Sequence, residues 1–222
     1  MQTDAKDYLY CAGLIGLAAA GTTCVVALVQ PWFLGMLGPY APVALFFLFA
    51  MVYGGFTAFL LAVIAKWLPL REGEYSMNDS QFTLWKVQHV VGEFAKLALS
   101  LFFPVVVRPA FYALFGARVG THVAVAGKIL DPRMTILEAG CVLGEGCILT
   151  SHAMAGGRFI LRGIRVGKGA TVGVGSILMP GVTIGAGAVV LPGSVLKSNT
   201  TVPADETWGG VPAVRIAGSA VR

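Results

Sequence analysis

The chain has 222 residues, of which 56% are apolar and only 12% are charged, with a net charge of +5. Soluble domains carry about 25% charged residues, so this composition argues against an ordinary water-soluble globular protein. Four cysteines fit no secreted disulfide framework, and no basic cluster interleaved with aromatic residues suggests nucleic-acid binding.

The two halves of the chain differ sharply in composition. Residues 8–65 contain no Asp, Glu, Lys or Arg, whereas residues 116–222 hold 20 of the 29 glycines and carry the whole net charge. The sequence therefore predicts a two-helix transmembrane region over 1–70, interfacial amphipathic helices over 71–115, and a glycine-rich domain over 116–222.

The uncharged run is too long for one membrane span, because about 20 apolar residues cross the hydrocarbon core. Prolines and glycines over 30–42 predict a break, with one span near Leu9–Val29 and a second near Val43–Ala65. A cleaved signal peptide is the alternative for the first span. Positive residues flank the spans at Lys6, Lys66 and Arg71, which places both ends in the cytoplasm. We expect a multi-pass protein of a bacterial inner membrane with its glycine-rich domain on the cytoplasmic side.

The stretch 81–103 has helical periodicity, with Lys86, His89, Glu93 and Lys96 spaced along it. The following apolar segment, 97–107, is too short to span and is interrupted by Pro104. We expect two amphipathic helices lying in the membrane surface, in contact with lipids. The alternative is a helix that packs under the second domain.

The back half repeats every six residues. An aliphatic residue occupies position one at 166, 172, 178, 184 and 190, and glycine occupies position four at 163, 169, 175, 181, 187 and 193. An aliphatic side chain that points inward, followed by a glycine at a tight corner, is typical of a parallel β-helix with three hexapeptides per coil. Cys141 and Cys147 occupy the small inward position and are expected to be core residues.

The repeat slips between Leu149 and Val166. Counted from Leu149 in steps of six, position one should fall at 167, but the repeat resumes one place early at Val166. Something must protrude there, and loops that interrupt a regular scaffold often carry function. His152 stands at the start of this break.

These repeats, together with Gly181–Gly185, Gly193–Lys197 and Gly209–Ala213, resemble the left-handed β-helix of hexapeptide-repeat acyltransferases. Residues 82–213 are similar to the membrane-anchored terminal domain of polylysine-synthase-type non-ribosomal peptide synthetases. The resemblance implies a homotrimer with acyl-transfer sites between neighbouring β-helices. It also implies a histidine general base, here His152, and a thioester donor along the C-terminal coils.

The resemblance assigns further roles by position. It places Val174 beside the pantetheine arm of coenzyme A (CoA) and Lys197 near the nucleotide phosphates. Arg215, just after the Val-Pro-Ala turn, is a second candidate for the phosphates, and Lys168 is a donor-binding candidate because it adds positive charge around the loop of His152. Arg158, Arg162 and Trp208 are the candidates for substrate contacts, and Arg165 adds positive charge to the same region. No tightly bound cofactor is expected; the co-substrate is an acyl-CoA, or an acyl or aminoacyl carrier protein.

Three functions remain open at this point. The first is a membrane acyltransferase that acylates a hydroxyl or amine with His152 as base, since imidazole has a pKa near about 6.5. The second is an amide-forming module that takes its acyl group from a carrier protein, and the third is a non-catalytic trimeric scaffold. A zinc hydratase is disfavoured because His89, His122 and His152 are scattered along the chain.

Overall fold

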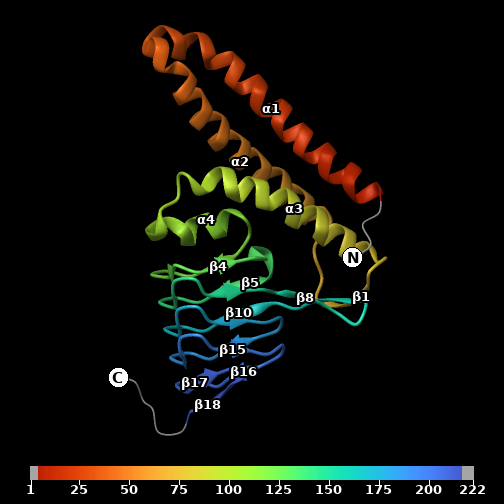
Figure 1. The fold of residues 1–222 in the computed structure, drawn as a ribbon, viewed down its shortest axis with the longest axis vertical. Helices are drawn as coiled ribbons and strands as arrows, with labels where there is room; N and C mark the ends of the chain where they lie inside the picture. The colour runs from red at the N-terminus through yellow and green to blue at the C-terminus, as the bar shows by residue number, and fades with distance from the viewer. Residues whose placement is uncertain (1–4, 217–222) are drawn as a thin grey trace. The chain divides into compact units, whose positions relative to one another are not determined.

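The computed structural model describes residues 5–216, which form two compact units. Within this range, the first unit comprises residues 5–70 and Ser80–Phe103, and the second comprises Arg71–Asp79 and residues 104–216. The first is helical and the second is built of short stacked strands (Figure 1).

The helical unit contains α1 (Ala5–Leu37), the short 3-10 helix η1 (Gly38–Tyr40), α2 (Ala41–Trp67) and α3 (Ser80–Ser100). The expected break over 30–42 is narrower than predicted, because α1 continues through Pro31 and the chain turns only at η1. Gly38 has φ of +51°, a left-handed conformation that glycine adopts without strain.

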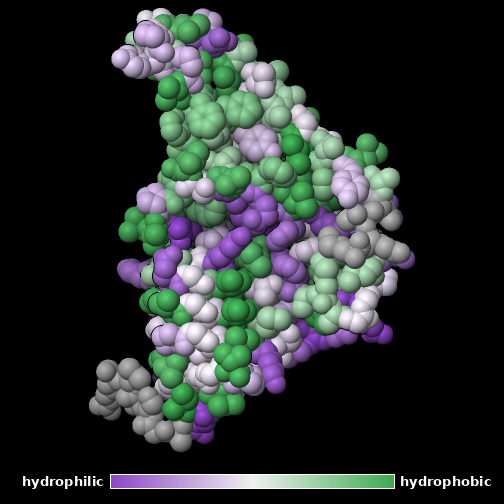
Figure 2. All heavy atoms as spheres, in the orientation of Figure 1, coloured by the Kyte–Doolittle hydropathy of each residue, from purple (hydrophilic) through white to green (hydrophobic). Residues whose placement is uncertain are grey.

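By length and composition, one helical stretch in the described chain, Ala5–Trp67, could cross a membrane. The two expected spans fall within α1 and α2 of this stretch. Figure 2 shows hydrophobic residues over much of the visible surface of these helices, with more hydrophilic residues near the turn between them. Large apolar side chains are exposed along both, among them Leu9, Leu28, Phe46 and Phe59.

α3 packs against α1 and α2 inside the helical unit. Leu61, Val87 and Val91 form a buried cluster with Cys11 and Ile64. Lys86, one of the charged residues spaced along the expected amphipathic helix, is only 5% exposed. Its ammonium pairs with Asp7 of α1, because a buried charge is tolerated only beside an opposite one.

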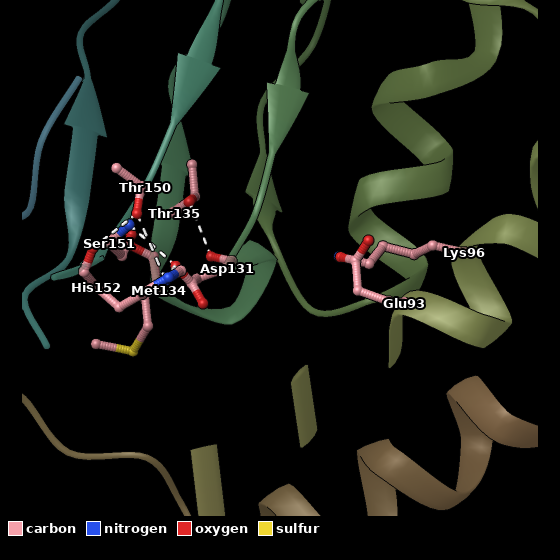
Figure 3. Close-up of polar contacts among 8 residues, drawn as sticks. All are labelled: Glu93, Lys96, Asp131, Met134, Thr135, Thr150, Ser151 and His152. Atoms are coloured by element: carbon pink, nitrogen blue, oxygen red, sulfur yellow. Dashed lines mark hydrogen bonds and ion pairs between the residues drawn. The ribbon is translucent and has the colours of Figure 1, made fainter. Parts of the chain in front are cut away.

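One face of α3 nevertheless stays open. Val90, Phe94 and Leu97, with Leu101 directly after the helix, are spaced at helical intervals and are 40–70% exposed. Elsewhere on the helix, Glu93 forms an ion pair with Lys96 in the next turn (Figure 3). α3 therefore has both a packed face and an exposed apolar stripe, as a membrane-surface helix would.

The second unit is a parallel β-helix whose strands stack in three sheets. The first sheet has the order β16 (Thr201–Val202), β13 (Thr183–Ile184), β10 (Ile164–Val166), β5 (Thr135–Leu137) and β2 (Arg118–Val119). The second has the order β18 (Ala213–Arg215), β17 (Thr207–Gly210), β14 (Val189–Val190), β11 (Thr171–Val172), β6 (Val142–Leu143) and β3 (Ala124–Val125). The third has the order β15 (Val195–Leu196), β12 (Ile177–Leu178), β7 (Ile148–Leu149) and β4 (Lys128–Ile129). Only β18 runs antiparallel within these sheets.

The hexapeptide register is the one that the sequence predicts. Thr171 pairs with Val189, which holds the same hexapeptide position one full coil later. The aliphatic residues at position one are at most 1% exposed, and Cys141 and Cys147 are fully buried. Burial raises the pKa of both thiols to about 11, which suits inert core residues.

Position four of each hexapeptide lies at a corner of the coil. Gly175 there has φ of +67°, and three non-glycine residues, His122, Asn199 and Asp205, take the same left-handed conformation with φ of 57–62°. Asparagine, aspartate and histidine tolerate this region better than other side chains. The place of His122 is thus explained by backbone geometry.

Both ends of the β-helix are covered. At the first coil, η2 (Val105–Val107) leads into α4 (Arg108–Leu114), where Arg108 donates from Nη1 to the carbonyl of Ala126 at 2.8 Å. The Tyr112 hydroxyl accepts the N–H of Ile129. At the last coil, β18 folds back on β17. Covering the terminal strands satisfies backbone groups that would otherwise be open to another chain.

A small antiparallel sheet, ordered β1-β9-β8, interrupts the solenoid. It consists of β1 (Gly73–Ser76), β8 (His152–Ala155) and β9 (Arg158–Leu161). The sequence predicts only helices over 71–115, but β1 lies there and pairs with β9 because the slip in the repeat leaves β9 with an open edge. This pairing joins 71–79 to the β-helix unit.

Candidate active site

The slip at His152 is a β-hairpin. β8 and β9 pair antiparallel around Gly156 and Gly157, whose φ angles are +56° and +74°. The hairpin inserts between β7 and β10, so Leu137 pairs with Val166 rather than with a residue one regular coil later. His152 is the first residue of the hairpin and, counted from Leu149, takes position four of its hexapeptide.

His152 forms a close pair with Asp131. Its Nδ1 lies 2.6 Å from Oδ2 of Asp131, and their side chains are 17% and 5% exposed (Figure 3). The same carboxylate oxygen accepts the backbone N–H of Ser151 at 3.0 Å. The Thr150 hydroxyl donates to the carbonyl of His152 at 2.7 Å, which holds the backbone at the root of the hairpin.

Asp131 is itself fixed by the turn that follows it. It precedes the 3-10 helix η3 (Pro132–Met134), and its carbonyl accepts the N–H of Met134 at 3.1 Å and the Thr135 hydroxyl at 3.0 Å. The Ser151 hydroxyl in turn donates to the carbonyl of Met134. Backbone and side-chain bonds thus lock the carboxylate in place.

This geometry selects one tautomer of the imidazole. A carboxylate accepts hydrogen bonds, so the proton of a neutral His152 ring belongs on Nδ1 and the lone pair on Nε2. The arrangement orients a base whose free nitrogen can take a proton from a reacting group.

Asp131 is absent from the sequence-based set of site residues. The feature that points to Asp131 is the pairing between neighbouring coils. β4 pairs with β7, so Asp131, the residue after Leu130, stacks beside Ser151 in the next coil. Ile129 pairs with Leu149 rather than with Cys147, the residue one regular coil later, because η3 lengthens this coil. A strict hexapeptide period therefore misses Asp131.

The basic residues expected around the hairpin are paired with acids. Arg162 donates to Glu74 of β1 at 2.8 Å and to Asn199 at 2.6 Å, and Arg158 lies 3.7 Å from the same glutamate. These contacts join the hairpin to β1. Arg158 and Arg162 therefore help to hold the hairpin against β1.

A second acid, Glu138, pairs with the next basic residues. Arg165 contacts its carboxylate at 2.6 Å, and the backbone N–H of Lys168 donates to it at 3.1 Å. The hydrogen bond from Arg165, and then that from Lys168, hold the pKa of Glu138 below its usual range. The Lys168 side chain is exposed.

The expected donor-binding residues lie in later coils. Val174 is 56% exposed after β11, and the Lys197 side chain is exposed after β15. Arg215 pairs with Glu206 at 3.2 Å, and the Trp208 indole donates to the same carboxylate at 2.9 Å. Trp208 is therefore tied to the last coil.

Across residues 5–216, no three His, Cys, Asp or Glu side chains gather in a way that could hold a metal ion. His89 stacks on Trp85 within α3, with ring centroids 4.8 Å apart.

No family model matches the chain, and no curated protein matches it. Solved structures do. A galactoside acetyltransferase in complex with coenzyme A is 15% identical, with a TM-score of 0.50, over 70% of this chain and 89% of that one. A hexapeptide-repeat-containing acetyltransferase from Vibrio cholerae is 19% identical, with a TM-score of 0.42, over 55% and 84%. A serine acetyltransferase from Brucella abortus is 18% identical, with a TM-score of 0.38, over 74% and 56%.

At this level of identity, the first likeness establishes the fold alone. The chain has the β-helix architecture that the galactoside acetyltransferase also has.

Proposed function

We propose that this protein is an integral-membrane acyltransferase that moves an acyl group, such as acetyl, from a CoA thioester to a hydroxyl or amine. The observation that carries the proposal is the His152–Asp131 pair, an oriented base at the root of the hairpin that interrupts the solenoid. A fold shared with an enzyme solved with coenzyme A supports the donor.

The reaction follows from the orientation of His152. The acceptor oxygen or nitrogen attacks the thioester carbonyl while Nε2 of His152 takes its proton. A bond forms between acceptor and carbonyl carbon, the carbon–sulfur bond breaks, and the thiolate leaves with the proton that the imidazolium returns. Asp131 stabilises the transient imidazolium through the bond to Nδ1.

The membrane part of the proposal rests on the helical unit. α1 has 33 residues and α2 has 27, so at about 1.5 Å per residue each is long enough to cross a hydrocarbon core of about 30 Å. We propose two spans, with the exposed stripe of α3 at the membrane surface and the β-helix in the bacterial cytoplasm. Anchoring a transferase in this way suits an acceptor that resides in the membrane.

The assembly part rests on the resemblance of the repeats to hexapeptide acyltransferases. We propose a homotrimer in which Val174, Lys197, Arg215 and Lys168 contact the donor. Arg158, Arg162 and Trp208 remain the candidates for contacts with the acceptor or the rim of the cleft.

The test is thioester turnover by detergent-purified protein. Wild type is compared with His152→Ala and with His122→Asn, a control that removes another histidine but tolerates the left-handed backbone at 122. The donors are acetyl-CoA, longer acyl-CoAs and an acyl carrier protein, offered with a panel of amines and membrane lipids. We expect activity that is lost in His152→Ala and kept in His122→Asn.

The other outcomes separate the alternatives. Turnover of the carrier-protein thioester alone would favour the amide-forming module that the similarity to peptide-synthetase terminal domains suggests. Equal activity in wild type and His152→Ala would refute the base, and no turnover of any thioester would favour the scaffold.

A further inference from the structure

Most of the arginines that the sequence suggests for contacts with donor or acceptor already pair with acidic side chains. Arg158 and Arg162 share Glu74, and Arg165 pairs with Glu138. An arginine that already contacts a carboxylate binds a second anion only by sharing or releasing the first.

Arg133 differs from these arginines. Within the described part of the chain, its guanidinium forms no hydrogen bond or ion pair, yet the residue is partly buried. Desolvation by burial lowers the pKa of this guanidinium. A partly desolvated cation without an acid is unfavourable in the free protein, and a bound anion would relieve it.

The backbone places Arg133 beside the proposed catalytic pair. It is the middle residue of η3, which follows Asp131 directly, and its neighbour Met134 accepts the hydrogen bond from Ser151. Residues two places apart lie at most about 7 Å from each other between Cα atoms, within the reach of one arginine side chain.

The Arg133 side chain extends toward the first coil. A Cβ at Gly116 would lie 2.8 Å from Cγ of Arg133 and 3.1 Å from Nη1. Gly116, with φ of +96°, comes just before β2, and β2 pairs with β5 directly after η3. The glycine leaves the room that the arginine side chain occupies.

Sheet order then separates two sides of the site. His152 follows β7, which lies between β12 and β15 on one side and β4 on the other. Lys197, a proposed donor contact, follows β15, whereas Arg133 follows β4. A donor that lies along the later coils and ends at His152 leaves the side of Arg133 to the acceptor.

We infer that Arg133 binds an anionic group, a phosphate or carboxylate, on the acyl acceptor. This inference rests on the proposed acyl transfer. The planar guanidinium matches such groups with two parallel N–H donors. Losing a hydrogen bond to a charged group weakens binding by roughly ten- to a hundredfold, so the KM of an anionic acceptor should rise by that factor.

The kinetic test uses pairs of amine acceptors that differ by one phosphate group, such as ethanolamine with phosphoethanolamine and glucosamine with glucosamine 6-phosphate. The variants are Arg133→Gln, Arg133→Lys and Arg118→Gln. Arg118 is a matched control because it is an exposed arginine of β2 in the neighbouring coil. We expect Arg133→Gln to raise the KM of the phosphorylated member only, with the KM for acetyl-CoA unchanged and partial recovery in Arg133→Lys.

A binding measurement separates this inference from the proposed activity. Inorganic phosphate should raise the Tm of wild type above that in chloride at equal ionic strength, because a ligand of the native state stabilises it. The rise should disappear in Arg133→Gln and persist in Arg118→Gln. No rise in wild type, or an undiminished rise in Arg133→Gln, would overturn the inference even if acyl transfer is found. A rise in Tm that depends on Arg133, without any thioester turnover, would support the anion site and refute the proposed acyl transfer.

Discussion

Replacing Asp131 with asparagine removes a negative charge from the imidazole but leaves an oxygen in its place. One carboxylate oxygen accepts both the Ser151 N–H at 3.0 Å and the bond from Nδ1 of His152 at 2.6 Å. The Ser151 N–H is buried and can only donate, so it selects the oxygen of the new side-chain amide rather than its NH2 group. The tautomer of His152 is thereby kept, and the loss is one of charge.

The size of that loss follows from the difference between two kinds of hydrogen bond. A bond to a charged group contributes roughly 1.5–3 kcal/mol, and a neutral one about 1 kcal/mol. The imidazolium of the transition state therefore loses about 0.5–2 kcal/mol, which lowers kcat about 2- to 30-fold. Asp131→Ala leaves the Ser151 N–H unpaired as well, so the free energy of unfolding should fall by about 1–3 kcal/mol.

The assay is thiol release from acetyl-CoA at saturating acceptor, with thermal unfolding of each variant in the same detergent. Asp131→Asn should retain the Tm of wild type within a few degrees and keep measurable activity, well above that of His152→Ala. Full activity in Asp131→Asn would show that the carboxylate does not act on His152. Activity as low as that of His152→Ala, at unchanged Tm, would contradict the expectation that Asp131→Asn keeps the proton of His152 on Nδ1.

Three further predictions concern other parts of the chain. Lys86→Ala should lower the free energy of unfolding by about 3–5 kcal/mol, because it strands the buried Asp7, and Asp7→Asn with Lys86→Met should restore most of the Tm in detergent. Cys147, with a pKa raised to about 11, should resist iodoacetamide at pH 8 until the protein unfolds, as peptide mass spectrometry would show. The lowered pKa of Glu138 contributes stability above about pH 4.3, the ordinary pKa of glutamate, and this contribution is lost as pH falls through the lowered value. Arg165→Gln should therefore lower Tm at pH 7 but not in strong acid; an equal drop at both would contradict the pairing.

The β-helix can be predicted from the sequence because its signal is local and repeated. Every sixth residue must be aliphatic to fill the interior, and the corners need a left-handed backbone. The protrusion at His152 is visible for the same reason, as a slip in that period. Both features can be recognised from the spacing of residues along the chain, without knowing which distant segments are in contact.

Other features depend on contacts between distant segments, and no local pattern reports them. β1 is a short segment of mixed polarity that forms a strand only because β9, far along the chain, offers an open edge. Lys86 has the spacing of a surface residue, yet it is buried against Asp7. Asp131 escapes a strict repeat because η3 shifts the coil away from its ideal period.

The path of the chain between the two units bears on how this protein can be dissected or recombined. The chain leaves the helical unit after Leu70, returns at Ser80 and leaves again after Phe103. No single cut therefore yields both units intact. A fragment that begins at Pro104 lacks the strand that borders the hairpin of His152, and one that begins at Arg71 carries α3 away from its helical partners. Exchange of the β-helix between relatives by one crossover would break one unit or the other, so we expect the two units to be inherited together.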